Sequence, residues 1–396
     1  MIVQRTFLGP GRKWVGPWRV RVNTEASGTS KLTVHSCLYG INKKLLLFDW
    51  GDGTQTISAN TYAKHTYAKP GDYIVSHYAR GNWDDVKLYC EGSEFLVEVL
   101  DAFPRLPAVG GSFNRVFNST KYLQTIPVDL FDNNADYITS LIGAFFGITG
   151  GPLHIPAGLC SHLYKLTDVS NMFGGGSTID YIPDGLFENM KTLTTAAGVF
   201  SNVNAAYAGS RIFAGCTGLT DIHNAFYAAH MDSLGDDTFN GCTSLDGEMS
   251  DALSVLYCKS VGARTYANCP SVTSCGHDFS AVPNLESLGD YTWQNCTGLV
   301  KVCEFLKSAP KLKTLPSHTF SNCPNFTMNG YMFYDQYSGT PVLGAFDLYL
   351  DNCPTMYNEF AYVPDMTSTT RRIIHVPAGC TAKSKFPTKY TIVADR

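Results

Sequence analysis

Phe213-Ala214-Gly215-Cys216-Thr217-Gly218-Leu219-Thr220-Asp221-Ile222 is the stretch that decides the fold, because it is one copy of a repeated unit. In this unit an aromatic residue stands three positions before a cysteine, and a leucine stands three positions after it. The cysteine column comprises Cys216, Cys242, Cys269, Cys296, Cys323 and Cys353, with spacings of 26, 27, 27, 27 and 30 residues. A repeat of this length predicts a solenoid, in which each coil buries its apolar columns against its neighbours.

The register continues towards the amino terminus with other residues in the cysteine column, which predicts about nine coils over residues 105–370. A second ring column is expected halfway between the cysteine units, at Phe117, Phe146, Phe173, Phe200, Phe226, Phe279, Phe305 and Phe333. Gly or Asn stands directly before each cysteine, as at Gly215 and Asn268, which predicts left-handed backbone there. Apolar spacings of three favour short extended or tight helical pieces that end in turns and not long amphipathic helices, and the chain is predicted to be mainly β.

These units resemble the BspA-like leucine-rich repeats of bacterial and phage surface proteins, whose form is Phe-x-Gly/Asn-Cys-x-x-Leu-x-x-Ile. Residues 213–222 match that form, and residues 293–302 match it with Trp and Val at the two ends. Residues 374–380, Ile-His-Val-Pro-Ala-Gly-Cys, look like the segment that closes such arrays, so residues 371–396 are assigned to a closing unit. The resemblance implies a leucine-rich-repeat solenoid with a role in surface recognition or adhesion.

Residues 18–104 have a different pattern, in which short alternating strands are separated by turn residues. Strands are expected at residues 18–22, 31–34, 44–48 and 73–75, which predicts a β-sandwich. The segment Phe48-Asp49-Trp50-Gly51-Asp52-Gly53-Thr54, followed by His65-Thr66-Tyr67, resembles the polycystic-kidney-disease (PKD) domain. That resemblance implies an immunoglobulin-like spacer, commonly joined to adhesion or carbohydrate-associated modules.

Asp49 and Asp52 are weak candidates for calcium ligands, because carboxylates three residues apart in a glycine-containing turn supply oxygens to one ion. The stronger interpretation is structural, with the Asp side chains capping the backbone amides of a tight turn. Cys37 and Cys90 are placed on facing strands, where a disulfide would form in an oxidising environment. No cofactor is expected.

The cysteine column is predicted to pack as buried thiols and not to bind zinc, because no Cys-x-x-Cys pair occurs in the chain. Replacing Cys269 or Cys296 with Ala is expected to cost about 1 kcal/mol for a small cavity. Ser is expected to be worse than Ala by roughly 1 to 3 kcal/mol, because its buried hydroxyl would lack a partner.

Composition restricts the class of partner. The chain has 396 residues and a net charge of -4, so it offers no broad basic face for a nucleic acid. No apolar stretch approaches the ~18 residues of a membrane-spanning helix, and residues 1–20 contain no secretory signal. No motif of a nucleotide-binding, zinc-hydrolase or serine-hydrolase site occurs. We therefore expect a non-enzymatic protein whose partner is a host-surface glycan or protein receptor.

The leading hypothesis is a phage fibre or decoration protein at the virion surface. The alternatives are a secreted bacterial cell-surface adhesin and, in another class, a glycan-degrading enzyme built on the solenoid. The lengthened coil before Cys353 is expected to carry the ligand-binding residues, because extra residues in a solenoid form a loop on one face. These candidates are Tyr331, Tyr334, Asp335, Gln336 and Tyr337. Residues 1–17 are expected to form an arm outside any strand, which either anchors other virion or surface proteins through Phe7 and Trp14 or is a disordered terminus.

Overall fold

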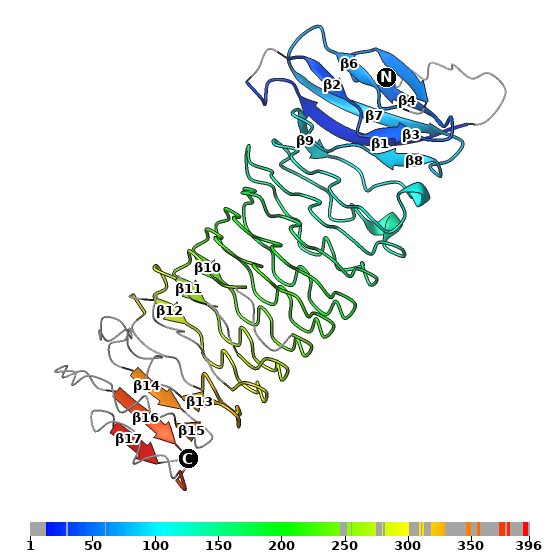
Figure 1. Ribbon diagram of the computed structural model, residues 1–396. Coiled ribbons are helices and arrows are strands. Elements are labelled where there is room, and N and C mark those ends of the chain that lie inside the picture. Colours follow the sequence, from blue (N-terminus) through cyan, green and yellow to red (C-terminus); the bar gives the residue numbers. More distant parts are fainter. Residues whose placement is uncertain are drawn as a thin grey trace.

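The computed structural model places a module of short strands at one end of a long stack of coils (Figure 1). It describes residues 13–28, 31–59, 61–245, 252–254, 256–274, 279, 282–300, 309, 311–312, 318–328, 346–349, 355–356, 372–376, 378–380 and 391–394. The helices among these residues are the single-turn 3-10 helices η1 (Pro107–Val109) and η2 (Asp132–Asn134). The prediction of a mainly β chain is therefore confirmed.

Nine strands form the amino-terminal module (Figure 1). They are β1 (Trp14–Asn23), β2 (Thr33–His35), β3 (Leu38–Gly40), β4 (Leu45–Asp49), β5 (Gln55–Ala59), β6 (Lys64–Thr66), β7 (Asp72–Arg80), β8 (Val86–Leu88) and β9 (Leu96–Val99). A five-stranded antiparallel sheet has the order β5-β4-β7-β1-β9, and the pairs β2-β6 and β3-β8 complete the module. The four expected strands overlap β1, β2, β4 and β7, whereas the other five have no counterpart in the sequence prediction.

The module core follows from the alternation of apolar and polar residues along β1. Trp18, Val20 and Val22 are buried, whereas Arg19 and Arg21 are exposed. Successive side chains of a strand point to opposite faces, so this pattern turns one face of β1 towards the core.

Strand β9 joins the module to the coils. One edge of β9 pairs with β1, and at its other edge the Val99 N–H donates to the Thr125 carbonyl over 3.0 Å. The Trp18 indole N–H donates to the Asp101 carbonyl over 3.0 Å. The Trp18 ring also stacks on Phe103, with ring centroids 5.4 Å apart. The module therefore covers the open edge of the first coil, which would otherwise present unpaired backbone groups to solvent.

Parallel backbone bridges connect each coil to the next. One column of bridges runs through Ser112, Ser140, Asp168, Thr195 and Asp221. A second runs through Ile182, Ala208 and Leu234, and it continues as the two-residue strands β10 (Ser233–Leu234), β11 (Ser260–Val261) and β12 (Ser287–Leu288). Because backbone amides of one coil donate to carbonyls of the next, the backbone hydrogen bonds of the stack are formed with little regular sheet.

Two columns of stacked aromatic rings fill the interior of the coil stack. The first contains Phe117, Phe145, Phe173, Phe200 and Phe226, with neighbouring centroids 5.1 to 5.7 Å apart. The second contains Phe187, Phe213, Phe239, Tyr266, Trp293 and Phe320, with neighbouring centroids 5.1 to 6.3 Å apart.

The prediction of the first ring column assigns one residue wrongly. The sequence analysis places Phe146 in the first column, but Phe145 fills that position and Phe146 is half-buried. The backbone hydrogen bonds give the reason, because they align Phe117, Phe145 and Phe173 from coil to coil. Two adjacent phenylalanines cannot be distinguished by residue type, and only this alignment decides which one points inward.

The expected left-handed positions before the cysteines are confirmed. Gly215, Asn268 and Asn295 have φ angles of 71°, 59° and 61°. These residue types tolerate the left-handed region, which L side chains otherwise avoid. The asparagines also connect the coils, because the Asn295 side-chain amide donates to Oδ1 of Asn268 over 2.7 Å.

Five strands are described near the carboxyl end. They are β13 (Thr327–Met328), β14 (Phe346–Tyr349), β15 (Thr355–Met356), β16 (Arg372–Val376) and β17 (Thr391–Ala394). Strands β14, β16 and β17 form a parallel sheet, in which His375 pairs with Val393. Residues 373–376 and 391–394 of the expected closing unit therefore lie side by side, and Cys380 is disulfide-bonded.

Candidate functional site

The glycine-rich turn after β4 and the His-Thr-Tyr segment pack against each other. The His65 ring stacks on the Trp50 indole with centroids 5.0 Å apart, and the Tyr67 hydroxyl donates to the Trp50 carbonyl over 2.8 Å. Gly51 has a φ of 82°, and a Cβ there would lie 2.7 Å from the Ile74 carbonyl oxygen, so only glycine fits. The two sequence motifs therefore form one structural unit.

The candidate calcium ligands make hydrogen bonds within this turn. Oδ1 of Asp49 accepts from the Gly51 N–H over 3.1 Å. Oδ1 of Asp52 accepts from the Thr54 N–H over 3.0 Å and from the Thr54 hydroxyl over 2.6 Å. Oδ2 of Asp52 lies 2.8 Å from Nε2 of His65. This geometry favours the structural interpretation of the turn, and no group of three or more His, Cys, Asp or Glu within the described residues is arranged to hold a metal ion.

Five thiols of the cysteine column donate to backbone carbonyls of the preceding coil. The acceptors belong to the aromatic residues of that coil, with Cys216 on Phe187, Cys242 on Phe213, Cys269 on Phe239, Cys296 on Tyr266 and Cys323 on Trp293, over 2.9 to 3.2 Å. Burial raises the pKa of Cys216 and Cys269 to about 12, which disfavours the reactive thiolate. The expectation that a serine hydroxyl would lack a partner here is wrong, because an acceptor is already in place.

Cys37 and Cys90 flank the paired strands β3 and β8, as the sequence analysis expects of facing strands. The Tyr89 N–H donates to the Cys37 carbonyl over 2.6 Å, and the Cys90 thiol lies 3.7 Å from the same oxygen. Both cysteines are buried free thiols. Burial, with the neighbouring Cys37 thiol, raises the pKa of Cys90. Disulfide formation between them stays a prediction.

Most binding residues expected from the sequence lie outside the described residues, namely Phe7, Tyr331, Tyr334, Asp335, Gln336 and Tyr337. Trp14 is described, and the structure corrects its assignment to an arm outside any strand. It is half-buried and begins β1, where it pairs with Arg80 of β7. Backbone pairing with β7 therefore includes residues that the sequence analysis assigned to the arm.

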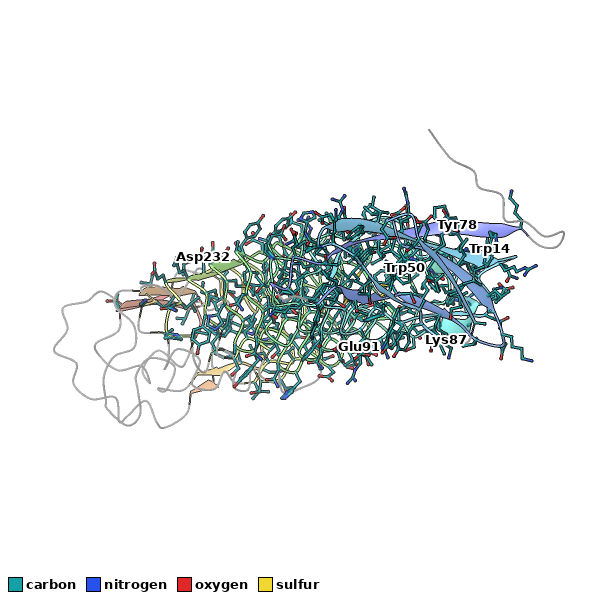
Figure 2. The ribbon with its side chains drawn as sticks, turned by 90° about the horizontal axis from the view of Figure 1, so that it is seen from above. Trp14, Trp50, Tyr78, Lys87, Glu91 and Asp232 are labelled. Atoms are coloured by element: carbon teal, nitrogen blue, oxygen red, sulfur yellow. The ribbon has the colours of Figure 1, made fainter. Side chains whose placement is uncertain are left out.

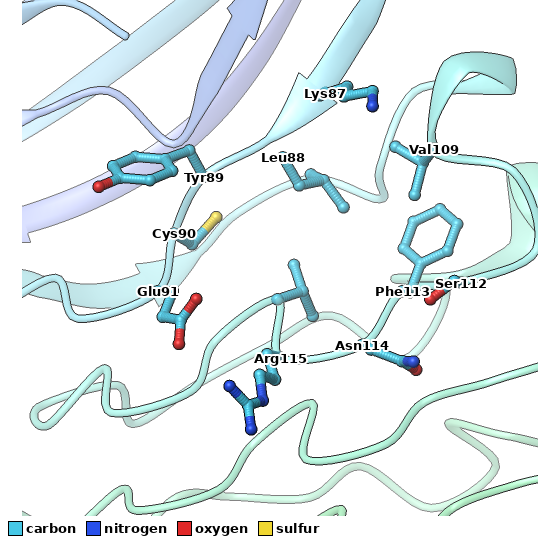
Figure 3. Close-up of a pocket in the computed structure, with 11 residues that line it drawn as sticks. Lys87, Leu88, Tyr89, Cys90, Glu91, Val109, Ser112, Phe113, Asn114 and Arg115 are labelled. Carbon is cyan, nitrogen blue, oxygen red and sulfur yellow. The ribbon is translucent and has the colours of Figure 1, made fainter.

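A pocket lies where the strand module meets the first coils, and we call it the junction pocket (Figure 3). Its volume is about 220 Å³. Leu88, Phe113 and Val116 supply apolar lining, and Lys87, Glu91 and Arg115 supply charged lining. Figure 3 shows Lys87 at one end of the pocket and Glu91 together with Arg115 at the other. The pocket thus combines an apolar surface with charges of both signs.

A second exposed feature is a column of side chains on the coil stack, which we call the tyrosine–serine column. Its members are Tyr181, Tyr207, Ser233, Ser260 and Ser287. The two tyrosine rings stack with centroids 5.2 Å apart and an interplanar angle of 13°. Tyr207 is 45% exposed, and the next position in the column is a serine. The column therefore continues beyond Tyr207 with a small side chain, Ser233.

Charged residues flank the tyrosine–serine column. Asp232 and Lys259 form an exposed ion pair with a nitrogen–oxygen distance of 2.9 Å. Asp180, in an earlier coil, lies 2.6 Å from Nδ1 of His154. Figure 2 shows Asp232 at the surface of the stack, separated from Lys87 along the long axis of the molecule. An aromatic face beside hydroxyl and charged groups is suited to a polar ligand with an apolar side, such as a sugar ring.

The sequence analysis missed both surfaces. Tyr181 and Tyr207 are 26 residues apart, which is one repeat, so the period places them in one column and was a usable signal. The junction pocket has no such signal. Residues 87–91 and 112–116 come together only because β9 attaches the strand module to the first coil.

The parallel bridges, the two ring columns and the buried cysteine column define a repeat protein built from stacked coils. A family model described as BspA type Leucine rich repeat region matches residues 162–255 and 259–329, in six copies. This part of the chain is therefore similar to BspA-type leucine-rich repeats, which are typical of surface adhesion proteins. Searches of curated proteins and of solved structures find no match. In the described residues, no helix has the length and apolar character needed to cross a membrane.

Proposed function

We propose that this chain is a non-enzymatic recognition protein of a virion surface, a phage fibre or decoration protein that binds a host receptor or glycan. The observation that carries the proposal is the tyrosine–serine column, which exposes an aromatic ring face on a regular stack of coils. A solenoid of about nine coils presents such a column in a fixed, extended geometry. The BspA-type repeats support a surface role.

The amino-terminal module acts in this proposal as an immunoglobulin-like spacer of the PKD type. Support comes from the packing of its two sequence motifs, because the His65 ring and the Tyr67 hydroxyl both contact Trp50. Its β9 edge continues into the coils through the bridge between Glu98 and Thr125. Forces on the coils would therefore be transmitted directly to the spacer.

Three described aspartates have pKa shifts opposite in direction to the one that a glycosidase acid needs. A glycosidase needs a general acid whose pKa is raised. The Arg105 guanidinium, which hydrogen-bonds Asp136, lowers the pKa of that carboxyl. Burial alone would raise the pKa of Asp237, but the hydrogen bonds from Arg264 and Asn240 and the charges of Arg264 and Arg211 together outweigh it, so the net shift is downward. Among the described residues, each Asp with a resolved shift has a lowered pKa.

The test of this proposal is binding of the purified full chain to isolated host envelopes, with Tyr207→Ala as the variant. Tyr207 is 45% exposed, so its loss is expected to leave the melting temperature within a few degrees. Binding is expected to weaken at least tenfold, or about 1.4 kcal/mol. The matched control is Tyr164→Ala, which removes a 74% exposed tyrosine outside the column and is expected to bind as the unmodified chain does. Equal losses in both variants would refute the column as the contact.

A bacterial cell-surface adhesin is the second candidate, because BspA-type repeats occur on surfaces of both kinds. An antibody against the purified chain separates the two. Labelling of particles in a lysate supports the virion, and labelling of intact cells supports the adhesin. Release of reducing ends from a polysaccharide by the purified chain would refute both and support a glycan-degrading enzyme.

A further inference from the structure

We propose that the junction pocket binds a carboxylated sugar, a single uronic or sialic acid unit of a surface glycan. This inference rests on the proposed recognition function and assigns a ligand class to a second site. The pocket volume of about 220 Å³ is below the usual range for drug-sized ligands, which favours a small ligand such as one sugar unit. Its apolar lining by Leu88 and Val116 matches the C–H face of a sugar.

The charges of the pocket select the ligand class. Lys87, Glu91 and Arg115 make no ion pair within 4.0 Å with any residue that the structure describes. Two cations and one carboxylate give the rim a net positive charge, which favours an anionic ligand. An arginine binds a carboxylate through two parallel hydrogen bonds, so Arg115 is assigned to the sugar carboxylate. Glu91, beside it in Figure 3, is placed to accept from sugar hydroxyls, and Lys87 lies at the far end.

The backbone of the first coil holds this arrangement in place. Oδ1 of Asn114 accepts from the Ser140 hydroxyl over 2.6 Å and from the Ile142 N–H over 2.9 Å. The Arg115 N–H donates to the Ile142 carbonyl over 2.9 Å. These bonds hold the backbone at Asn114 and Arg115 in place, so the Arg115 side chain extends from a rigid segment.

Arg115 also has an unfavourable backbone conformation for its residue type. Its φ is 55°, and the equivalent positions of the next four coils are Gly143, Asn171, Gly198 and Asn224, with φ angles of 59°, 55°, 61° and 55°. Glycine and asparagine tolerate this region, whereas arginine does not favour it. Arg211 and Arg264 have similar φ angles of 57° and 54°, so the strain at Arg115 supports the choice of test variant and not the site itself.

This column supplies a test variant that keeps the fold. Arg115→Asn introduces the residue that Asn171 and Asn224 already provide in later coils, so the melting temperature is expected to stay equal or to rise. The matched control is Lys191→Gln, which removes an exposed cation of the coil stack outside the pocket. Neither variant changes the tyrosine–serine column.

The experiment is a titration of the full chain with sodium D-glucuronate, N-acetylneuraminate, D-glucose and inorganic phosphate, followed by NMR. At least one of the two acidic sugars is expected to bind at least tenfold more tightly than D-glucose. In Arg115→Asn this preference is expected to fall below twofold, while Lys191→Gln keeps it. The same affinities for the acidic sugars and for D-glucose would overturn the proposal, as would no binding or an unchanged preference in Arg115→Asn.

Three further outcomes separate the sugar from its charge and this site from the proposed function. If inorganic phosphate binds as tightly as the acidic sugars, the pocket is a general anion site and the sugar assignment is wrong. If Arg115→Asn binds host envelopes normally and acidic sugars do not bind, recognition stands and only this inference fails. If acidic sugars bind at the pocket but the full chain does not bind host envelopes, the proposed function fails and the sugar site stands.

Discussion

The cysteine column gives the sharpest prediction, because the structure reverses the order expected of two substitutions. Cys269 is buried, and its thiol donates to the Phe239 carbonyl over 3.2 Å. That carbonyl also accepts from the Cys242 N–H over 3.1 Å. Removing the thiol therefore leaves the carbonyl with one of its two hydrogen bonds and does not orphan it.

The magnitudes follow from these contacts. Cys269→Ala removes the sulfur and leaves a small cavity, at a cost of about 1 kcal/mol. Cys269→Ser loses the same packing, but its hydroxyl can donate to the Phe239 carbonyl, and a neutral hydrogen bond contributes a net ~0.5 to 1.5 kcal/mol. We therefore expect Cys269→Ser to be no less stable than Cys269→Ala.

Cys160 is the matched control within the same chain. It is fully buried, and its thiol makes no hydrogen bond with any residue in the described ranges. At that position the buried hydroxyl of Cys160→Ser does lack an acceptor, so it is expected to be less stable than Cys160→Ala by roughly 1 to 3 kcal/mol. The two sites should thus give opposite orders of Ser and Ala.

Amide hydrogen exchange of the coil that contains each cysteine is the appropriate assay, because stability in a stack of repeats is a sum of local terms. Protection factors of the four variants give the local opening free energies, and a urea titration checks that each variant is folded. Finding Cys269→Ser below Cys269→Ala by more than about 2 kcal/mol would refute the role of the carbonyl acceptor. The same order at both sites would also contradict the reasoning.

Three other predictions concern the strand module and the coil of altered length. Burial lowers the pKa of His77 to about 4, so the folded protein keeps this ring neutral while the unfolded chain protonates it near its ordinary value of 6.5. The associated stability is present above pH 6.5 and is lost as the pH falls towards 4, about 3 kcal/mol in total. In urea unfolding, the unfolding free energy of His77→Leu should therefore decrease by correspondingly less across this pH window. Exposure of the folded chain to oxidised glutathione should join Cys37 to Cys90, detected as a loss of two hydrogens by mass spectrometry; two thiols that remain free after full equilibration would contradict the expected bridge. Replacing Tyr334 and Tyr337 together with Ala should leave the melting temperature within a few degrees and weaken receptor or glycan binding at least tenfold, and unchanged binding by the folded double mutant would place the contact elsewhere.

The features that the sequence predicts are those set by periodicity. The cysteine spacing, the rings three positions earlier and the left-handed residues before each cysteine all recur with the coil, so a single chain contains several independent copies of the same information. The wrong assignment of Phe146 instead of Phe145 to the ring column shows the limit of prediction from periodicity. Two like residues stand side by side, and the backbone hydrogen bonds of neighbouring coils decide which one is buried.

The periodicity of the sequence does not predict the hydrogen-bond partners of individual polar atoms. The acceptor for the Cys269 thiol is a carbonyl of the preceding coil, 30 residues earlier in the chain. Every coil has many carbonyls, and which of them faces the thiol depends on how far one coil is rotated over the next. A hydrophobic pattern fixes which residues are buried and leaves their hydrogen-bond partners open.

The junction pocket lies at the boundary between the strand module and the coils. Neither the alternating pattern of the strands nor the repeat of the coils therefore predicts it. The period-two pattern ends in β9, and the repeat begins in the coil that pairs with β9 through Thr125. Each side contributes an incomplete surface, because β8 and the following turn supply Lys87 and Glu91 and the first coils supply Arg115. An uncovered strand edge is prone to pair with other chains, and the module that covers it brings new side chains against the coil. The contact that closes the edge of the stack thereby creates its pocket, so stability at this junction and the proposed sugar binding depend on the same packing.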